Sequence, residues 1–486
     1  MAIPITSQSR VIAPSRRASP ELRQLAEQVF TRAAGAPLVA GNAVRILRDA
    51  HENYPAWLAA IAAARRSVLF ENYIIASDET GREFVAALTE RAQAGVAVRL
   101  IYDWMGALGV GTRGLLQPLI DAGGVVRCFN PPQLDSPFGW LTRDHRKMLA
   151  VDGTVGYVSG LCVSGKWRGD PEHGIDPWRD TGIEIRGPGV ADVERAFAQT
   201  WAAAAGNDAD VLDVAFADDV PPAGDVLVRV LASQPMTAGM YRLDQMIAAM
   251  ARDTLWLTDA YFVGVAPYVQ ALRAAAMDGV DVRLLVPGTS DVALLSTLSR
   301  SGYRPLLEAG IRVFEWNGAM LHAKTAVADC RWARVGSTNL NIASWISNYE
   351  LDVAIEDAKF ADCMQGMYEE DLANATEIVL GARRRVRPSV MPRRRAGSSG
   401  RASRAAAGAL RIGNTVGAAF SGRRTLNTVE PGLMFVVALG FLLFTALVML
   451  VPLAVTVPLA ALALWIAVTL LVRAWRTRKR SRMAGS

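Results

Sequence analysis

The 486-residue chain is 51% hydrophobic and 20% charged, and its 41 glycines follow no repeating period, which excludes a disordered or a collagen-like protein. Its four cysteines are widely spaced and form no CxxC pair, so neither a disulfide scaffold nor a zinc cluster is predicted. The net charge of +6 is unevenly divided, because residues 381–486 carry +17 and residues 1–380 carry −11. An acidic body argues against nonspecific nucleic-acid binding, which depends on neutralising phosphates.

The first 380 residues predict an α/β protein with an internal duplication. Residues 1–36 form a polar leader without the apolar core of a secretory signal, and one short helix begins there at Pro20. After the leader, β-branched runs alternate with alanine-rich helical stretches. The order helix, strand, helix, strand is expected over 57–64, 67–75, 81–94 and 96–102, and again over 243–252, 254–263, 266–278 and 280–286. This recurrence divides the body into halves at 37–215 and 216–380.

The end of the chain predicts a membrane anchor. Residues 381–430 are a linker rich in arginine, serine and glycine, which we expect to lie against anionic lipid headgroups. Residues 431–472 contain no charged residue and are long enough for two bilayer crossings. Basic residues before this stretch and in the tail 473–486 place both of its ends in the cytoplasm. We therefore expect a transmembrane hairpin; one tilted span with a re-entrant piece is the alternative.

One sequence motif occurs twice and gives the duplication a fixed register. The chain has only four histidines and five lysines, yet the pattern HxKxxxxD appears in both halves. The two copies are His145, Lys147 and Asp152, and His322, Lys324 and Asp329. Each residue of the first copy is followed by its counterpart 177 residues later. Such a repeat of rare residues is far beyond chance and indicates a paired catalytic site.

At these residues the chain resembles the phospholipase D superfamily, with its paired HKD motifs, and within it the bacterial cardiolipin synthases. The resemblance extends over about residues 37–370. It implies two α/β halves related by pseudo-twofold symmetry, with both motifs at one cleft. It also implies phosphatidylglycerol as substrate and no nucleic-acid partner. The expected location is the bacterial inner (cytoplasmic) membrane, with the catalytic body facing the cytoplasm.

The paired motifs suit transfer at a phosphodiester. A neutral imidazole can attack phosphorus, and an imidazolium on the opposite side can protonate the departing alkoxide. The resemblance assigns the first role to His145, which would form a phosphohistidine, and the second to His322, which then acts as base for the incoming alcohol. Lys147 and Lys324 are expected to hold the nonbridging phosphate oxygens. No metal or other cofactor is then required.

Each imidazole needs a carboxylate that fixes its tautomer and stabilises its charged form. The candidates are Asp180 and Glu350, which lie 35 and 28 residues after the histidine of their own half, at positions that resemble those of the family's orienting acids. The motif acids Asp152 and Asp329 are, by the resemblance, more structural than catalytic. We expect them to pin the turn that follows each motif strand.

Further polar residues are candidates for binding the phosphate. Asn339 is expected to donate a hydrogen bond to it, with Ser337 beside it. Cys162 stands at the matching place in the first half, where the family pattern has asparagine. Because a thiol is a poor donor, Ser159 or Ser164 is a candidate replacement.

The function that these features favour is a membrane-bound phosphatidyltransferase that makes cardiolipin from phosphatidylglycerol. A hydrolase of the same superfamily, releasing phosphatidic acid, is the main alternative, because water can resolve the same phosphohistidine. A nuclease is disfavoured by the acidic body and the apolar segment. An inactive lipid-binding scaffold stays open because of Cys162. The resemblance, and not the chemistry, favours transfer over hydrolysis.

Overall fold

A computed structural model describes residues 20–108, 112–132, 141–204, 212 and 220–380, together with isolated residues between 439 and 468. Within these described ranges, no helix combines the length and the apolar character needed to cross a bilayer. The predicted hairpin at 431–472 lies almost wholly outside the described residues, and the linker 381–430 and the tail 473–486 lie wholly outside them.

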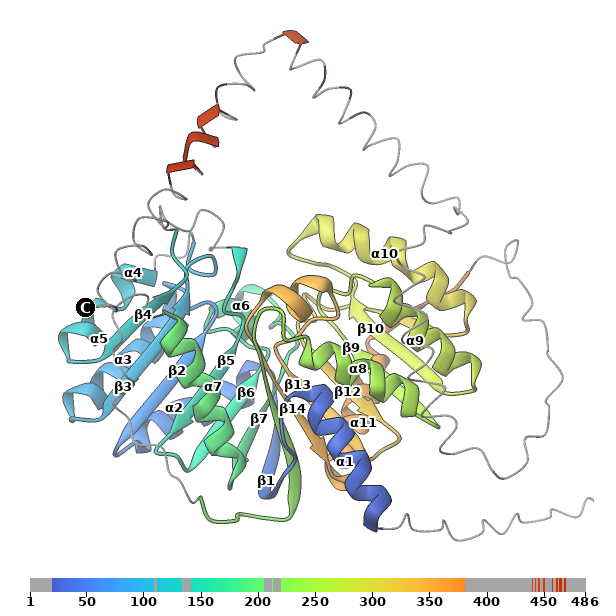
Figure 1. Ribbon diagram of the computed structural model, residues 1–486. Helices are drawn as coiled ribbons and strands as arrows, with labels where there is room; N and C mark the ends of the chain where they lie inside the picture. Colours follow the sequence, from blue (N-terminus) through green and yellow to red (C-terminus); the bar gives the residue numbers. More distant parts are fainter. Residues whose placement is uncertain are drawn as a thin grey trace, which may run out of the picture.

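A mixed sheet of 15 strands runs through the body (Figure 1), in the order β15-β11-β10-β9-β12-β13-β14-β8-β1-β7-β6-β5-β2-β3-β4. The strands of the first half are β1 (Val39–Arg48), β2 (Ser67–Asn72), β3 (Ala97–Asp103), β4 (Val125–Phe129), β5 (Lys147–Val151), β6 (Val155–Ser159) and β7 (Thr181–Arg186). Those of the second half are β8 (Val226–Ser233), β9 (Thr254–Thr258), β10 (Asp281–Pro287), β11 (Arg312–Trp316), β12 (Thr325–Ala328), β13 (Trp332–Gly336), β14 (Glu350–Glu356) and β15 (Ala375–Ile378). Apart from β15, the order is the same when read outward from β1 or from β8, which is the predicted duplication.

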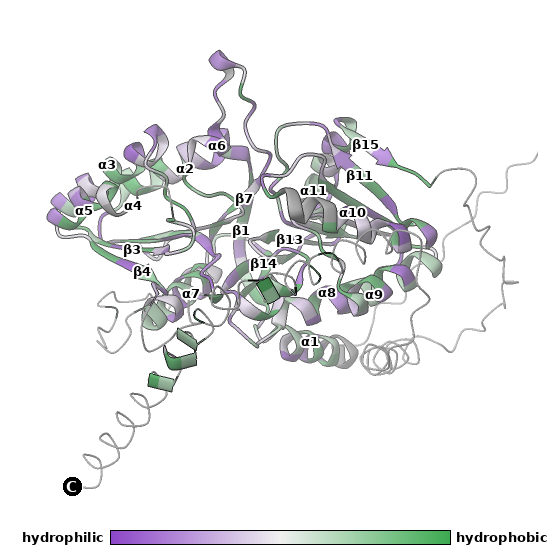
Figure 2. Cartoon of the chain, turned by 90° about the horizontal axis from the view of Figure 1, so that it is seen from above, coloured by the Kyte–Doolittle hydropathy of each residue, from purple (hydrophilic) through white to green (hydrophobic). Residues whose placement is uncertain are grey.

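The helices follow the same duplication. The first half contains α2 (Asp49–Ala63), α3 (Glu79–Gln93), α4 (Thr112–Leu115), α5 (Gln117–Asp121), α6 (Gly165–Arg168), η2 (Pro171–His173) and α7 (Gly189–Ala204), after α1 (Pro20–Ala34). The second contains α8 (Gly239–Met250), α9 (Ala266–Met277), α10 (Ala293–Glu308), the π-helical turn η3 (Ala343–Ser347) and α11 (Ala358–Ala373). Seen from above, α2, α3 and α11 lie on one side of the strands, and α7, α8 and α9 lie on the other (Figure 2). The two halves thus present equivalent helices to opposite sides, as a pseudo-twofold axis requires.

The eight elements predicted from the sequence are all present with the predicted type. The largest difference is at α2, which begins at Asp49 and not at residue 57. Pro55 lies inside this helix, and a proline removes a backbone donor and normally ends a helical pattern. That is why the sequence pattern placed the helix start too late.

The two motif aspartates make equivalent contacts at the ends of β5 and β12. The Asp152 carboxylate accepts hydrogen bonds from the backbone N–H groups of residues 65–67, at 2.7 to 2.9 Å. The Asp329 carboxylate accepts them from residues 252–254, at 2.8 to 3.2 Å. Both aspartates have a left-handed backbone, with φ of 55° and 52°. These are the contacts expected of residues that pin the turn after a strand.

Replacing Asp329 by alanine is expected to lower the free energy of unfolding by about 1–2 kcal/mol, because three backbone donors lose a charged acceptor at a partly exposed turn. Guanidinium unfolding of the full chain measures the change. Asp278→Ala is the matched control, because Asp278 is an exposed residue at the end of α9. Equal unfolding midpoints for the two variants would contradict the turn-pinning role.

Candidate active site

The two motif histidines lie at equivalent strand ends in the two halves. His145 comes just before β5, which runs antiparallel to β2, and His322 comes just before β12, which runs antiparallel to β9. Both therefore lie where β2 and β9 end. The backbone N–H of His145 donates to the Tyr349 carbonyl at 2.9 Å, and that of His322 donates to the Arg179 carbonyl at 2.7 Å. Each histidine is thus tied to a strand start in the other half of the chain.

These ties pair each histidine with the acid of the opposite half. His145 Nδ1 lies 2.9 Å from Glu350 Oε2, and His322 Nδ1 lies 2.8 Å from Asp180 Oδ2. The structure therefore brings both predicted acids to the histidines but corrects their pairing, which the sequence analysis had placed within each half. The crossing arises because β7, which begins just after Asp180, and β14, which begins at Glu350, lie near the middle of the sheet, where the halves meet.

Each acid accepts a second hydrogen bond on the oxygen that faces its imidazole. Ser337 Oγ donates to Glu350 Oε2 at 2.6 Å, and Trp167 Nε1 donates to Asp180 Oδ2 at 2.8 Å. Ser337 was predicted to bind phosphate; in the structure its hydroxyl donates to Glu350 and accepts the Leu351 N–H. Trp167, which the sequence analysis did not select, occupies the corresponding place at Asp180.

The electrostatics of the site favour two neutral imidazoles and two ionised acids. Burial lowers the pKa of His145 to about 4 and that of His322 to about 3, with the motif lysines adding to both shifts. Burial alone would raise the pKa of Asp180 and of Glu350, but the paired histidine and a nearby lysine hold each pKa below its ordinary value. An imidazole that donates Nδ1–H to a carboxylate keeps its lone pair on Nε2. Each dyad therefore presents a nucleophilic or basic nitrogen.

The motif lysines place two cations beside these imidazoles. Lys147 and Lys324 are 0% and 1% exposed. Lys147 Nζ donates to the His145 carbonyl at 2.5 Å, and Lys324 Nζ lies 2.9 and 3.1 Å from the two ring nitrogens of His322. Burial lowers the pKa of Lys324 to about 8. Two buried ammonium groups that act on both imidazoles form a site for an anionic group such as a phosphodiester.

The surroundings of the two histidines differ. Tyr73 lies beside His145, with ring centroids 5.1 Å apart. Three aromatic rings surround His322, namely Trp167 at 5.1 Å and Trp178 and Tyr261 at 5.7 Å. The exposed fraction of the side chain is 12% for His145 and 5% for His322. The second dyad is therefore the more enclosed of the two.

The other predicted phosphate ligands have different environments. Asn339 is 4% exposed, and its Oδ1 has no protein partner among the described residues; the amide is a candidate through its NH2 group, which is the part that can donate to phosphate. Ser159 is fully buried, and its Oγ accepts the Leu161 N–H at 3.1 Å, which leaves the hydroxyl proton as a donor. Cys162 is 1% exposed, and burial raises the pKa of its thiol. It therefore stays a neutral, weak donor.

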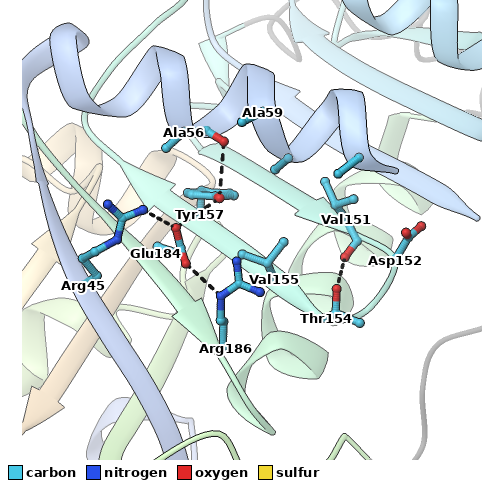
Figure 3. A pocket seen from close by; sticks show the side chains of 12 residues that line it. Arg45, Ala56, Ala59, Val151, Asp152, Thr154, Val155, Tyr157, Glu184 and Arg186 are labelled. Carbon is cyan, nitrogen blue, oxygen red and sulfur yellow. Dashed lines mark hydrogen bonds and ion pairs between the residues drawn. The ribbon is translucent and has the colours of Figure 1, made fainter. Parts of the chain in front are cut away.

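A separate hollow of about 360 Å³ lies against α2 and strands β5 to β7 (Figure 3). Arg45 and Arg186 line it and both bind Glu184, at 2.6 and 2.9 Å. The acid offsets their charge, and the hollow contains neither motif histidine nor motif lysine. It is not a candidate for the chemistry of the paired motifs.

Comparison with known protein families identifies relatives of this chain. A family model described as "Cardiolipin synthase, PLD-like domain" matches residues 57–166 and 244–372, and these two ranges contain both histidine and lysine pairs. The chain is 34% identical to cardiolipin synthase A of Pseudomonas fluorescens (strain SBW25) over 352 residues, covering 70% of this chain and 71% of that protein. It is 31% identical to the cardiolipin synthase of Halalkalibacterium halodurans over 367 residues, covering 73% and 71%.

Among solved structures, the phosphatidylserine synthase of Haemophilus influenzae resembles the fold, with a TM-score of 0.54 at 14% sequence identity. The match covers 72% of this chain and 92% of that one. It supports the arrangement of two α/β halves.

Proposed function

We propose that this chain, which belongs to the cardiolipin synthase family of phospholipase D-like proteins, makes cardiolipin from two molecules of phosphatidylglycerol through a phosphohistidine. The chain is a phosphatidyltransferase-like enzyme of that superfamily. The observation that carries the proposal is the pair of carboxylate-bound imidazoles, each with a buried motif lysine beside it.

In the first step, Nε2 of neutral His145 attacks the phosphorus of one phosphatidylglycerol. The P–N bond forms as the bond from phosphorus to the glycerol oxygen breaks, and His322 gives its proton to that oxygen. His322 is neutral in the empty site, and the arriving phosphodiester anion favours its protonation. Lys147 and Lys324 stabilise the charge on the nonbridging oxygens. Free glycerol leaves, and the phosphatidyl group stays on His145.

In the second step, His322 acts as base. It removes the proton from a glycerol hydroxyl of a second phosphatidylglycerol, whose oxygen attacks phosphorus as the P–N bond breaks. Cardiolipin leaves, and both histidines return to their first states. The aromatic rings around His322 favour this outcome over hydrolysis, because they limit the access of water to the base.

Mass spectrometry of the products tests this function. Detergent-solubilised protein given phosphatidylglycerol is expected to release cardiolipin and glycerol in equal amounts. Phosphatidic acid as the main product would establish the hydrolase instead. If neither cardiolipin nor phosphatidic acid is formed, the result contradicts both the transferase and the hydrolase.

The low pKa of His145 gives a pH dependence that can be measured without the second histidine. A phosphatidyl ester of p-nitrophenol needs no proton on its leaving group, so its first turnover reports the nucleophile alone. Because the pKa of His145 is about 4 and that of Lys324 about 8, the burst of p-nitrophenol is expected to be constant from about pH 7 down to about pH 5.5 and to fall as the pH approaches 4. The reference is the pH dependence of p-nitrophenol release from the same ester by free imidazole. A half-maximal burst near pH 6.5 would contradict the shifted pKa.

Membrane attachment through residues 431–472 is part of the proposal and has its own test. The apolar segment and its basic flanks favour insertion as a hairpin. Deleting residues 431–486 is expected to move the protein from the membrane to the soluble fraction after cell lysis. Deleting only the tail 473–486 is the control and should leave it in the membrane. If the protein without residues 431–486 still resists extraction from the membrane, the hairpin is not its sole anchor.

A further inference from the structure

The carboxylate of each histidine–carboxylate dyad accepts a second hydrogen bond, and the donor differs between the two dyads. Glu350 receives the hydroxyl proton of Ser337, and Asp180 receives the indole N–H of Trp167. Both carboxylates and Ser337 are 0% exposed, and Trp167 is 2% exposed. A buried donor to an ionised acceptor makes one of the stronger protein hydrogen bonds. Each donor therefore holds its carboxylate, and through it the imidazole, in one orientation.

The symmetry of the fold explains why the donors differ. The register of β5 with β6 matches that of β12 with β13, so Gly160 is the counterpart of Ser337. A Cβ at Gly160 would lie 2.2 Å from Asp180 Oδ1, so a serine cannot fit there without moving the acid. The donor to Asp180 has to come from another element. It comes from α6, whose Trp167 also packs edge-on against His322.

We infer that Trp167 is a positioning residue for His322, acting through Asp180, and that Ser337 is the corresponding positioning residue for His145. The inference rests on the proposed two-step transfer, in which His322 is the acid and His145 the nucleophile. The groups that face His322 are the Asp180 carboxylate, the ammonium groups of Lys324 and Lys147, and the Tyr261 ring. The indole N–H fixes the carboxylate among these charges, so that Nε2 of His322 stays directed at the departing oxygen.

A change of leaving group separates the two roles. Glycerol must receive a proton as it leaves, whereas p-nitrophenolate leaves without one. Trp167→Phe removes the N–H and keeps an aromatic ring. It is expected to slow cardiolipin formation about 10- to 50-fold and to change the p-nitrophenol burst by less than about threefold. Ser337→Ala acts on the nucleophile and is expected to slow both reactions by similar factors.

Trp345→Phe is the matched control. Trp345 is a buried indole on η3, which follows β13 as α6 follows β6, and it packs against Tyr241 and Tyr268. This variant should stay within about threefold of the parent protein on both substrates. Thermal melts of all variants show whether each is folded.

Several results would overturn the inference. One is an equal loss on both substrates in Trp167→Phe, and another is a loss no larger than that of Trp345→Phe. If Trp167→Phe does not fold, Ser337→Ala tests the inference instead. A loss of cardiolipin formation with an unchanged p-nitrophenol burst would show that Ser337 acts on the proton donor and not on the nucleophile. A parent protein that yields neither cardiolipin nor a burst would overturn the proposed function and this inference with it. If the parent protein makes cardiolipin but Trp167→Phe slows both reactions equally, the inference is overturned and the proposed function is not.

Discussion

Replacing His145 or His322 by alanine is expected to lower cardiolipin formation by about 10⁴-fold or more, because one variant lacks the nucleophile and the other lacks the proton donor and base. The variants differ at the first step. His145→Ala should give no p-nitrophenol burst from the activated ester. His322→Ala should give the burst and then stop, with the phosphatidyl group still on His145, because no base activates the second alcohol.

Product analysis and intact-protein mass spectrometry measure these outcomes together. The trapped intermediate adds the mass of one phosphatidyl group to His322→Ala and none to His145→Ala. His51→Ala is the control, because His51 is 70% exposed and should keep full activity. Cardiolipin formation at more than about one hundredth of the parent rate in either active-site variant would contradict the two-histidine mechanism. An adduct on the His145→Ala protein would show that the assigned roles are exchanged.

The sequence predicts which residues form this site better than it predicts which of them contact one another. The repeated spacing of two rare residue types identifies the histidines and lysines, and the α/β alternation predicts the halves that carry them. The pairing of acids with histidines cannot be read from spacing, because it depends on how the halves meet. Asp144 bridges to Tyr349, and Arg179 bridges to Leu321. These backbone bridges place each acid against the histidine of the other half.

Side chains just after a strand were the hardest to assign. Ser337 and Ser159 differ little in sequence context, and both hydroxyl oxygens accept a backbone N–H, yet Ser337 also donates to a catalytic-site carboxylate. The direction of each side chain depends on where its strand ends, and such boundaries are the least certain part of a sequence-based prediction. Trp167 gave a weaker signal still. Its role depends on the clash that excludes a side chain at Gly160, which only the three-dimensional structure shows.

The crossed pairing predicts that each acid variant behaves like the histidine variant of the opposite half. Asp180→Asn should lower cardiolipin formation about 10²- to 10³-fold and keep the p-nitrophenol burst, as His322→Ala does, although the two residues are 142 positions apart. Glu350→Gln should lose the burst, as His145→Ala does, across 205 positions.

Each acid has the other as its matched control, since both are fully buried and both substitutions are neutral amides of similar size. Pairing within each half would give the reverse result, with the burst lost in Asp180→Asn and kept in Glu350→Gln. Equal loss of the burst in both variants would mean that the carboxylates hold the site together and do not serve separate steps. Selective loss would show that neither half of the duplication is a complete catalytic unit, because each provides the histidine for one step and the carboxylate for the other.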